Sequence, residues 1–285
     1  MQKHASIVLV QILLFASFSF AQKNEPIDAM SFNIRYDNPE DGKQNWHHRK
    51  ENVVRMINFY DLDIIGMQEV LLSQLNYLKE HLGQYKTVGV GREDGKDKGE
   101  FAPIFYRKDR FKMLKTGTFW LSETPEKASK GWDASLERIA TWVVLREKIS
   151  EKEFVFMNTH FDHKGKRARM ESAMLLKQKS NELAGDLPLI LSGDFNLVPE
   201  SEAIKTLIQP DGQHTLVNSS NVATYIYGPN WTSCGFDNRP FQERKVIDYI
   251  FVKGVKKVNK YAVFSEMLND IYLSDHCPVF AQIEL

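Results

Sequence analysis

The sequence has few cysteines, no net charge and no repeats or low-complexity segments. Only Cys234 and Cys277 occur among 285 residues, which excludes a disulfide-rich scaffold and leaves open whether these two form one disulfide. Basic and acidic residues both number 37, so no overall positive field attracts a polyanion. No Pro/Ser-rich linker interrupts the chain, and residues 22–285 are therefore expected to form a single domain.

Long hydrophobic runs are also lacking, except at the N-terminus. The stretch 5–20 contains no charged residue, follows Lys3, and is succeeded by Ala21. A basic start, a short apolar run and small residues before the cleavage point are typical of a secretory signal, here residues 1–21. The run is short for a membrane-spanning helix, so an uncleaved anchor is the less favoured alternative. We expect a periplasmic or secreted protein without a stable membrane anchor.

Hydrophobic periodicity divides the remaining chain into strands and helices. Strand-like runs cover 28–34, 63–67, 85–90, 101–107, 111–121, 139–146, 154–158, 187–192, 246–252, 258–264 and 277–283. Helical spacing covers 46–60, 73–82, 166–184 and 199–208, and 210–244 is expected to be mostly loop. Many strands and few helices, in the order β-α-β-α and then mostly β, predict two packed sheets with helices outside.

Polar residues stand at the ends of several predicted strands. The segments are Ser31-Phe32-Asn33-Ile34-Arg35, Met67-Gln68-Glu69-Val70, Asn158-Thr159-His160-Phe161-Asp162-His163, Ser192-Gly193-Asp194-Phe195-Asn196, and Val246-Ile247-Asp248-Tyr249-Ile250-Phe251 together with Asp275-His276. Charged and amide side chains are rarely buried without partners, so these residues are unlikely to serve as core packing alone. Their positions predict that one rim of the two sheets forms a cleft. Hard oxygen ligands beside histidine suit metal-assisted phosphate hydrolysis.

These segments, in this order, resemble the endonuclease/exonuclease/phosphatase superfamily, and the likeness runs from Ser31 to Val279. The sequence most resembles exported bacterial members of this superfamily. Among the other branches, it is distantly more similar to the deadenylase–nocturnin group. The resemblance implies an α/β (α+β) fold of the DNase-I-like type. This is a four-layer α/β sandwich in which two mostly antiparallel β-sheets are flanked by helices. It also implies a divalent cation, Mg²⁺ with Mn²⁺ as the alternative, and in-line attack of water on a phosphoester.

The resemblance further implies a role for each candidate residue. The expected metal ligands are Glu69, Asn33 and Asp275. Asp194 is expected to orient and deprotonate water, and Asn196 to hold the same water or the phosphate. His276 and His160 are expected to donate to the phosphate, with Asp248 fixing the tautomer of His276. The residues expected to shape the substrate pocket are Tyr106, Arg138, Asp162, Arg35 and Arg92.

The loops favour a small phosphorylated substrate such as a sugar phosphate, nucleotide or lipid head group. Residues 91–100 carry both basic and acidic side chains, and such a loop binds a phosphate backbone poorly. A nuclease acting on short or single-stranded nucleic acid is the alternative. A catalytically silent phosphate-binding module is a third hypothesis, and the intact Glu69, Asp194 and His276 argue against it. We expect the protein to be a monomer.

Overall fold

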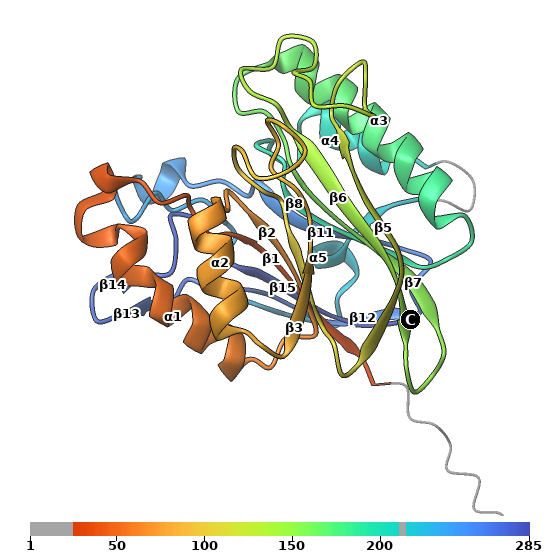
Figure 1. Cartoon of the computed structure of the whole chain (residues 1–285), viewed down its shortest axis with the longest axis horizontal. Helices are drawn as coiled ribbons and strands as arrows, with labels where there is room; N and C mark the ends of the chain where they lie inside the picture. The colour runs from red at the N-terminus through yellow and green to blue at the C-terminus, as the bar shows by residue number, and fades with distance from the viewer. Residues whose placement is uncertain (1–24, 211–214) are drawn as a thin grey trace, which may run out of the picture.

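The computed structural model describes residues 25–210 and 215–285 (Figure 1). The predicted signal, residues 1–21, lies outside the described residues. Within the described ranges, no helix has both the length and the apolar character required to cross a bilayer.

Two mixed β-sheets occupy the centre of the molecule (Figure 1). The strands of the first sheet are β1 (Ile27–Asn33), β2 (Ile64–Gln68), β3 (Tyr85–Val88), β4 (Ile104–Arg107), β10 (Tyr225–Tyr227), β12 (Lys257–Val263) and β15 (Val279–Glu284). The strands of the second are β5 (Phe111–Trp120), β6 (Ile139–Glu147), β7 (Glu153–His160), β8 (Leu189–Asp194), β9 (Val217–Asn218) and β11 (Asp248–Lys253). A small hairpin, β13 (Met267–Leu268) and β14 (Ile271–Tyr272), stands apart from both.

Most neighbouring strands in each sheet are antiparallel. The first sheet has the order β10-β12-β15-β1-β2-β4-β3 and the second the order β5-β6-β7-β8-β11-β9. The parallel neighbours are β1 with β2, β10 with β12, and β7 with β8. Both parallel pairs that lie centrally, β1–β2 and β7–β8, therefore end at the same rim of their sheets, where the polar strand ends were predicted to meet.

Helices cover the outer face of each sheet (Figure 1). Helices α1 (Trp46–Phe59) and α2 (Leu72–His81) share a buried apolar cluster with β1 and β2. Helices α3 (Lys166–Ala184) and α4 (Glu202–Ile208) share another with β7, β8 and β11. A third cluster fills the space between the sheets. The four predicted layers are thus confirmed, with further short turns of helix at α5 (Ser219–Val222), Pro39–Gln44 and Phe241–Glu243.

The predicted helices and strands are found with small shifts at their ends. Helix α2 begins at Leu72, one residue before the predicted start, and Gln74 stabilises this end because its side chain accepts a hydrogen bond from the Leu71 amide. Helix α4 begins after Ser201, whose hydroxyl accepts a hydrogen bond from the Ile204 amide, and not at Pro199. Local hydrogen bonds that periodicity does not report set these boundaries.

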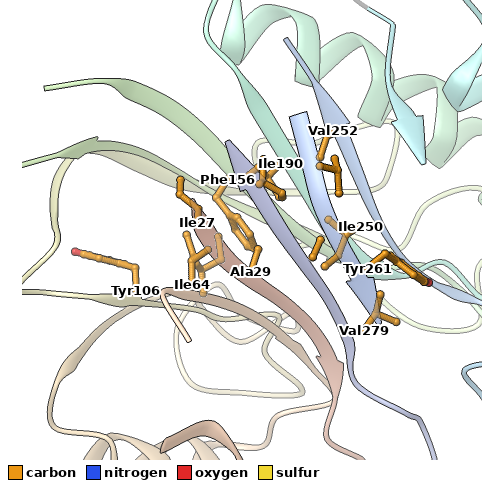
Figure 2. Packing of buried hydrophobic residues seen from close by; sticks show 14 of the residues in the cluster. Ile27, Ala29, Ile64, Tyr106, Phe156, Ile190, Ile250, Val252, Tyr261 and Val279 are labelled. Carbon is orange, nitrogen blue, oxygen red and sulfur yellow. The ribbon is translucent and has the colours of Figure 1, made fainter. Parts of the chain in front are cut away.

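Side chains between the sheets change from apolar to polar along each central strand. Alternate residues face the opposite sheet. In order toward the rim they are Ile64, Gly66 and Gln68 on β2; Phe156, Asn158 and His160 on β7; and Ile190, Ser192 and Asp194 on β8. The apolar members belong to the core between the sheets, several of whose residues Figure 2 shows side by side. One continuous interior therefore provides a hydrophobic core at one end and a polar site at the other.

A buried asparagine joins the sheets between the core and the rim. The Asn158 amide nitrogen, on β7, donates to the carbonyl oxygens of Met67 at 2.7 Å and Pro103 at 3.1 Å. The Asn158 side-chain oxygen accepts from Gln68 at 2.6 Å and from Ser192 at 3.1 Å. Every polar atom of this side chain is therefore engaged, which is the condition for burying an amide without a penalty.

The close approach at Asn158 explains the glycine at position 66. A Cβ atom at Gly66 would lie 2.1 Å from the Ser192 hydroxyl oxygen and 2.6 Å from the Asn158 side-chain oxygen. Any side chain there pushes the sheets apart and breaks the hydrogen bonds between them.

We predict that Gly66→Ala lowers the free energy of unfolding by about 1–3 kcal/mol, the usual cost of overpacking an interior. Chemical denaturation followed by far-UV circular dichroism measures this. The matched control is Gly83→Ala, because a Cβ at Gly83 meets nothing within 4 Å and its φ is not in the left-handed region. Equal stability of the two variants would show that the sheets are not held at this distance by Asn158.

Candidate active site

The backbone turns sharply where β1, β2 and β8 reach the rim. Arg35, Glu69 and Asn196 each have a positive φ, of 58°, 59° and 52°. Left-handed backbone at a residue other than glycine costs about 1 kcal/mol or more, and it persists where the surroundings impose it, often at functional sites. These turns direct side chains from three strand ends into one space.

Asn33 connects the acidic residues of the two sheets. Its amide nitrogen lies 3.0 Å from Glu69 Oε1 and 3.0 Å from Asp194 Oδ2, and it donates to both. Its oxygen accepts from the Arg35 amide at 3.0 Å, which fixes the orientation of the group. Asn33 was predicted as a metal ligand. Its oxygen keeps a second acceptor position beside the bond from Arg35, so this role stays a prediction, while its amide nitrogen orients the two carboxylates.

His276 forms a pair with the buried carboxylate of Asp248. Their closest atoms, His276 Nδ1 and Asp248 Oδ2, are 2.9 Å apart, and the Thr232 hydroxyl donates to the same Oδ2 at 2.6 Å. Burial alone lowers the pKa of His276, but the carboxylates of Asp248 and Asp194 outweigh it and raise that pKa well above its usual value. The ring is therefore charged at neutral pH, with Nε2–H free to donate into the cavity.

The second histidine, His160, is uncharged, unlike His276. Burial, helped by Arg138 and Arg92, lowers its pKa well below the usual value. The Asn196 amide nitrogen donates to the Phe161 carbonyl at 3.1 Å and lies 3.2 Å from His160 Nε2, which must therefore accept. His160 was predicted as a second donor to the phosphate. In this arrangement His160 Nε2 orients Asn196, the remaining N–H of the neutral ring is on Nδ1, and donation to the phosphate stays a prediction.

Asp194 has the properties of a general base. Burial, reinforced by the nearby Asp248 carboxylate, raises its pKa to about 7. Its Oδ1 accepts from the Asn196 amide at 2.9 Å, and its Oδ2 lies 3.8 Å from His276 Nδ1. A carboxylate that titrates near neutral pH can remove a proton from water there. Asp194 and His276 thus supply a base and an acid within one site.

These groups line a cavity of about 360 Å³, which is at the small end of the range for ligand sites. Its lining residues are Arg35, Tyr36, Glu69, Glu100, Leu136, Arg138, His160, His163, Asp194, Asn196 and His276. The sequence did not identify Tyr36, Leu136 and His163 as site residues, because all three lie in loops, where hydrophobic periodicity gives no signal. His163 carried one signal, its place three residues after His160 in the same polar segment.

Acidic partners neutralise the cations of the site. Arg35 Nε lies 3.0 Å from Asp41 Oδ2, and Arg138 Nε lies 3.5 Å from Asp162 Oδ2. Arg92 pairs with Glu100 at 2.6 Å. The cavity therefore has no strip of unpaired positive charge among its lining residues.

Three of the residues predicted to bind substrate do not face the cavity. Arg92 and Asp162 are buried behind its wall and act through Glu100 and Arg138. Tyr106 is 1% exposed and pairs with Ile64, at the start of β2, so it belongs to the core at the far end of the strand from Glu69 (Figure 2). Strand β4 runs antiparallel to β2, and periodicity does not reveal strand direction.

The donor set at the rim suits a hard divalent cation. Glu69, His160 and Asp194 each have a ligand-type atom within 4.8 Å of the others, but His160 Nε2 already accepts from Asn196, so the two carboxylates are the available ligands. Each oxygen of Glu69 accepts one hydrogen bond, from Asn33 or from the Tyr36 amide at 3.2 Å, which leaves a second acceptor position on each. Asp275, the third predicted ligand, has its Oδ2 4.0 Å from Arg35 Nε and is outside this group. Glu69 would be the principal ligand, since Mg²⁺ takes one or two protein carboxylates.

The chain is similar to known proteins in both sequence and fold. Residues 30–276 match the profile of the Endonuclease/Exonuclease/phosphatase family. The structure of a protein of that family from Bacteroides vulgatus is 41% identical, with a TM-score of 0.87, and the match covers 91% of this chain and 99% of that one. A mannosyl-6-phosphatase structure from Bacteroides thetaiotaomicron is 40% identical, with a TM-score of 0.85 and coverage of 91% and 100%.

A more distant curated relative has a different described activity. The CCR4-Not complex 3'-5'-exoribonuclease subunit Ccr4 of Mycosarcoma maydis is 21% identical over 270 residues. The match covers 75% of this chain but only 39% of that protein. The likeness therefore spans most of the present chain and a minor part of the relative.

We predict that Glu69→Gln weakens divalent-cation binding about tenfold or more, because the amide keeps the shape but loses the negative charge. Isothermal titration with Mg²⁺ and the cation dependence of phosphate-ester hydrolysis measure the effect. Glu80→Gln, on the exposed surface of α2, is the matched control and should bind the cation as the wild type does. Unchanged cation affinity in the Glu69 variant would remove this residue from the metal site.

We predict that Asp248→Asn moves the alkaline limb of the kcat/KM–pH profile to lower pH by about 1–3 units, the usual effect of an opposing charge. Asp248 raises the pKa of His276, so its loss lets the ring give up its proton at a lower pH. Asp109→Asn, at an exposed ion pair with Arg107, is the control. An alkaline limb that stays in place would show that protonation of His276 does not govern it.

Proposed function

The chain belongs to the Endonuclease/Exonuclease/phosphatase family, whose members hydrolyse phosphate esters, and we propose that it is a Mg²⁺-dependent phosphatase of a small phosphorylated substrate, foremost a sugar phosphate. The observation that carries this proposal is the cavity itself. It is small, and each arginine of the site is paired with a carboxylate. A nucleic-acid groove needs unpaired cations along a backbone path.

The similarity to the mannosyl-6-phosphatase supports the same substrate class. It extends over nearly the whole of both chains at 40% identity. Fold alone does not determine substrate, so the argument depends on the cavity and the neighbour together.

The residues of this chain account for the proton movements of such a reaction. Asp194 takes a proton from the attacking water, which Asn196 helps to place. His276, held charged by Asp248, donates from Nε2 to the phosphate oxygen on which negative charge grows. Glu69 would hold the cation, which when bound neutralises charge on the phosphate. Water adds to phosphorus as the ester P–O bond breaks, and the leaving oxygen takes up a proton from solvent, to which Asp194 releases the one it removed, giving inorganic phosphate and an alcohol.

Nuclease activity is the second candidate, and the exoribonuclease relative is the observation that favours it. The run Lys164-Gly165-Lys166-Arg167 lies beside the cavity and is mostly exposed, so it could contact a phosphate backbone. Against this, the chain has no net charge. We also propose that the protein is exported, on the basis of residues 1–21, and that it acts as a monomer.

We predict that protein from residue 22 onward releases phosphate from sugar phosphates with Mg²⁺ and that a chelator abolishes the release. The panel contains mannose 6-phosphate, glucose 6-phosphate, p-nitrophenyl phosphate, bis-p-nitrophenyl phosphate and single-stranded DNA. Cleavage of DNA alone, with affinity falling steeply as salt rises, would replace the phosphatase proposal by the nuclease. Cleavage of only the diester would identify a phosphodiesterase.

A further inference from the structure

One lining residue of the cavity, His163, has no part in the reaction described above. It follows Asp162 in the loop after β7, and it is exposed. It lies on the cavity wall with Leu136 and Arg138. Its position is therefore suited to the part of the substrate that is not phosphate.

The neighbours of His163 determine which ring nitrogen carries the proton. Arg138 Nη2 lies 3.0 Å from His163 Nδ1, and a guanidinium can only donate. The Ser135 hydroxyl, 3.5 Å from the same nitrogen, already donates to Asp162 at 2.7 Å. Nδ1 must therefore accept, and in the neutral ring the hydrogen is on Nε2.

The arginine that imposes this tautomer is itself held firmly. Arg138 is 4% exposed, and its Nε faces Asp162 Oδ2. Asp162 is fixed in turn by the backbone amides of Lys164 and Gly165, at 2.9 Å and 2.7 Å. Burial and the charge of Arg138 also lower the pKa of His163, so the ring is neutral near pH 7. Nε2–H has no hydrogen-bond partner among the described residues.

We propose that His163 determines substrate specificity by donating a hydrogen bond from Nε2 to a hydroxyl oxygen of the substrate's alcohol portion. This inference rests on the proposed function and specifies its substrate as polyhydroxylated. A neutral donor distinguishes hydroxyl from hydrocarbon, whereas the charged His276 serves the phosphate. Leu136, on the same wall, offers apolar surface to the carbon skeleton.

The test compares mannose 6-phosphate, which carries hydroxyl groups, with p-nitrophenyl phosphate, which does not. We expect His163→Ala to lower the ratio of kcat/KM for the two esters about tenfold, mainly through KM for the sugar phosphate. His163→Gln retains an amide N–H near the position of Nε2 and should restore most of the ratio. His163→Asn places its amide at the position of Nδ1 and should behave as the alanine variant.

The outcomes separate this inference from the proposed function. A wild-type protein that hydrolyses no sugar phosphate would overturn the proposed function, and this inference with it. If the wild type hydrolyses the sugar phosphate and all three variants keep the wild-type ratio of kcat/KM for the two esters, the inference alone is overturned. An unchanged ratio would overturn it even if kcat/KM falls, because equal losses of kcat/KM on both esters indicate a merely structural role.

The tautomer has a readout that does not depend on activity. Long-range ¹H–¹⁵N spectra of the imidazole rings, assigned by comparison with His163→Gln, should show His163 protonated on Nε2 and unprotonated on Nδ1 at pH 7. Protonation on Nδ1 would overturn the proposal. Arg138→Lys, which removes the planar donor from Nδ1, should increase the population of the other tautomer, and no change would contradict the role assigned to Arg138.

Discussion

The contact of Asn158 with both sheets is the constraint on which the site depends. Three of its four hydrogen bonds cross from β7 to the first sheet and fix the separation of the sheets, the fourth joins it to Ser192 on β8, and Gly66 leaves the required space. The functional side chains of these strands, Glu69, His160 and Asp194, follow this contact by one or two residues. A change in the separation of the sheets would therefore change the distances between the base, the cation ligand and the phosphate.

Two largely buried histidines of one cavity differ in charge because their neighbours differ. His276 faces carboxylates and keeps its proton, whereas His160 lies near Arg138 and Arg92 and is neutral. The same arginines are paired with acids, so they shape the site without making it strongly positive. A site of this kind supplies a proton donor and a neutral positioning group, and its lack of unpaired arginines is what supports the proposal of a small substrate.

The strand ends that carry the chemistry were readable from the sequence because charge and amide groups seldom occur there without a function. Glu69, Asp194, Asn196 and His276 all line the cavity, as expected. The hydrogen-bond partners of Asn33 and His160 were not readable, because they are contacts between residues far apart in the chain. Tyr106 was misplaced because a strand's hydrophobic pattern is the same in both directions.

The sequence by itself determined the family, the layered fold and the residues at the rim, since period-two patterns and short polar motifs are local features. Tertiary structure alone decided the pairing of the sheets through Asn158, the charge states of the histidines and the wall formed by Leu136 and His163. Each of these depends on contacts between residues far apart in the chain. Such contacts set burial and electrostatic environment, which no local pattern encodes.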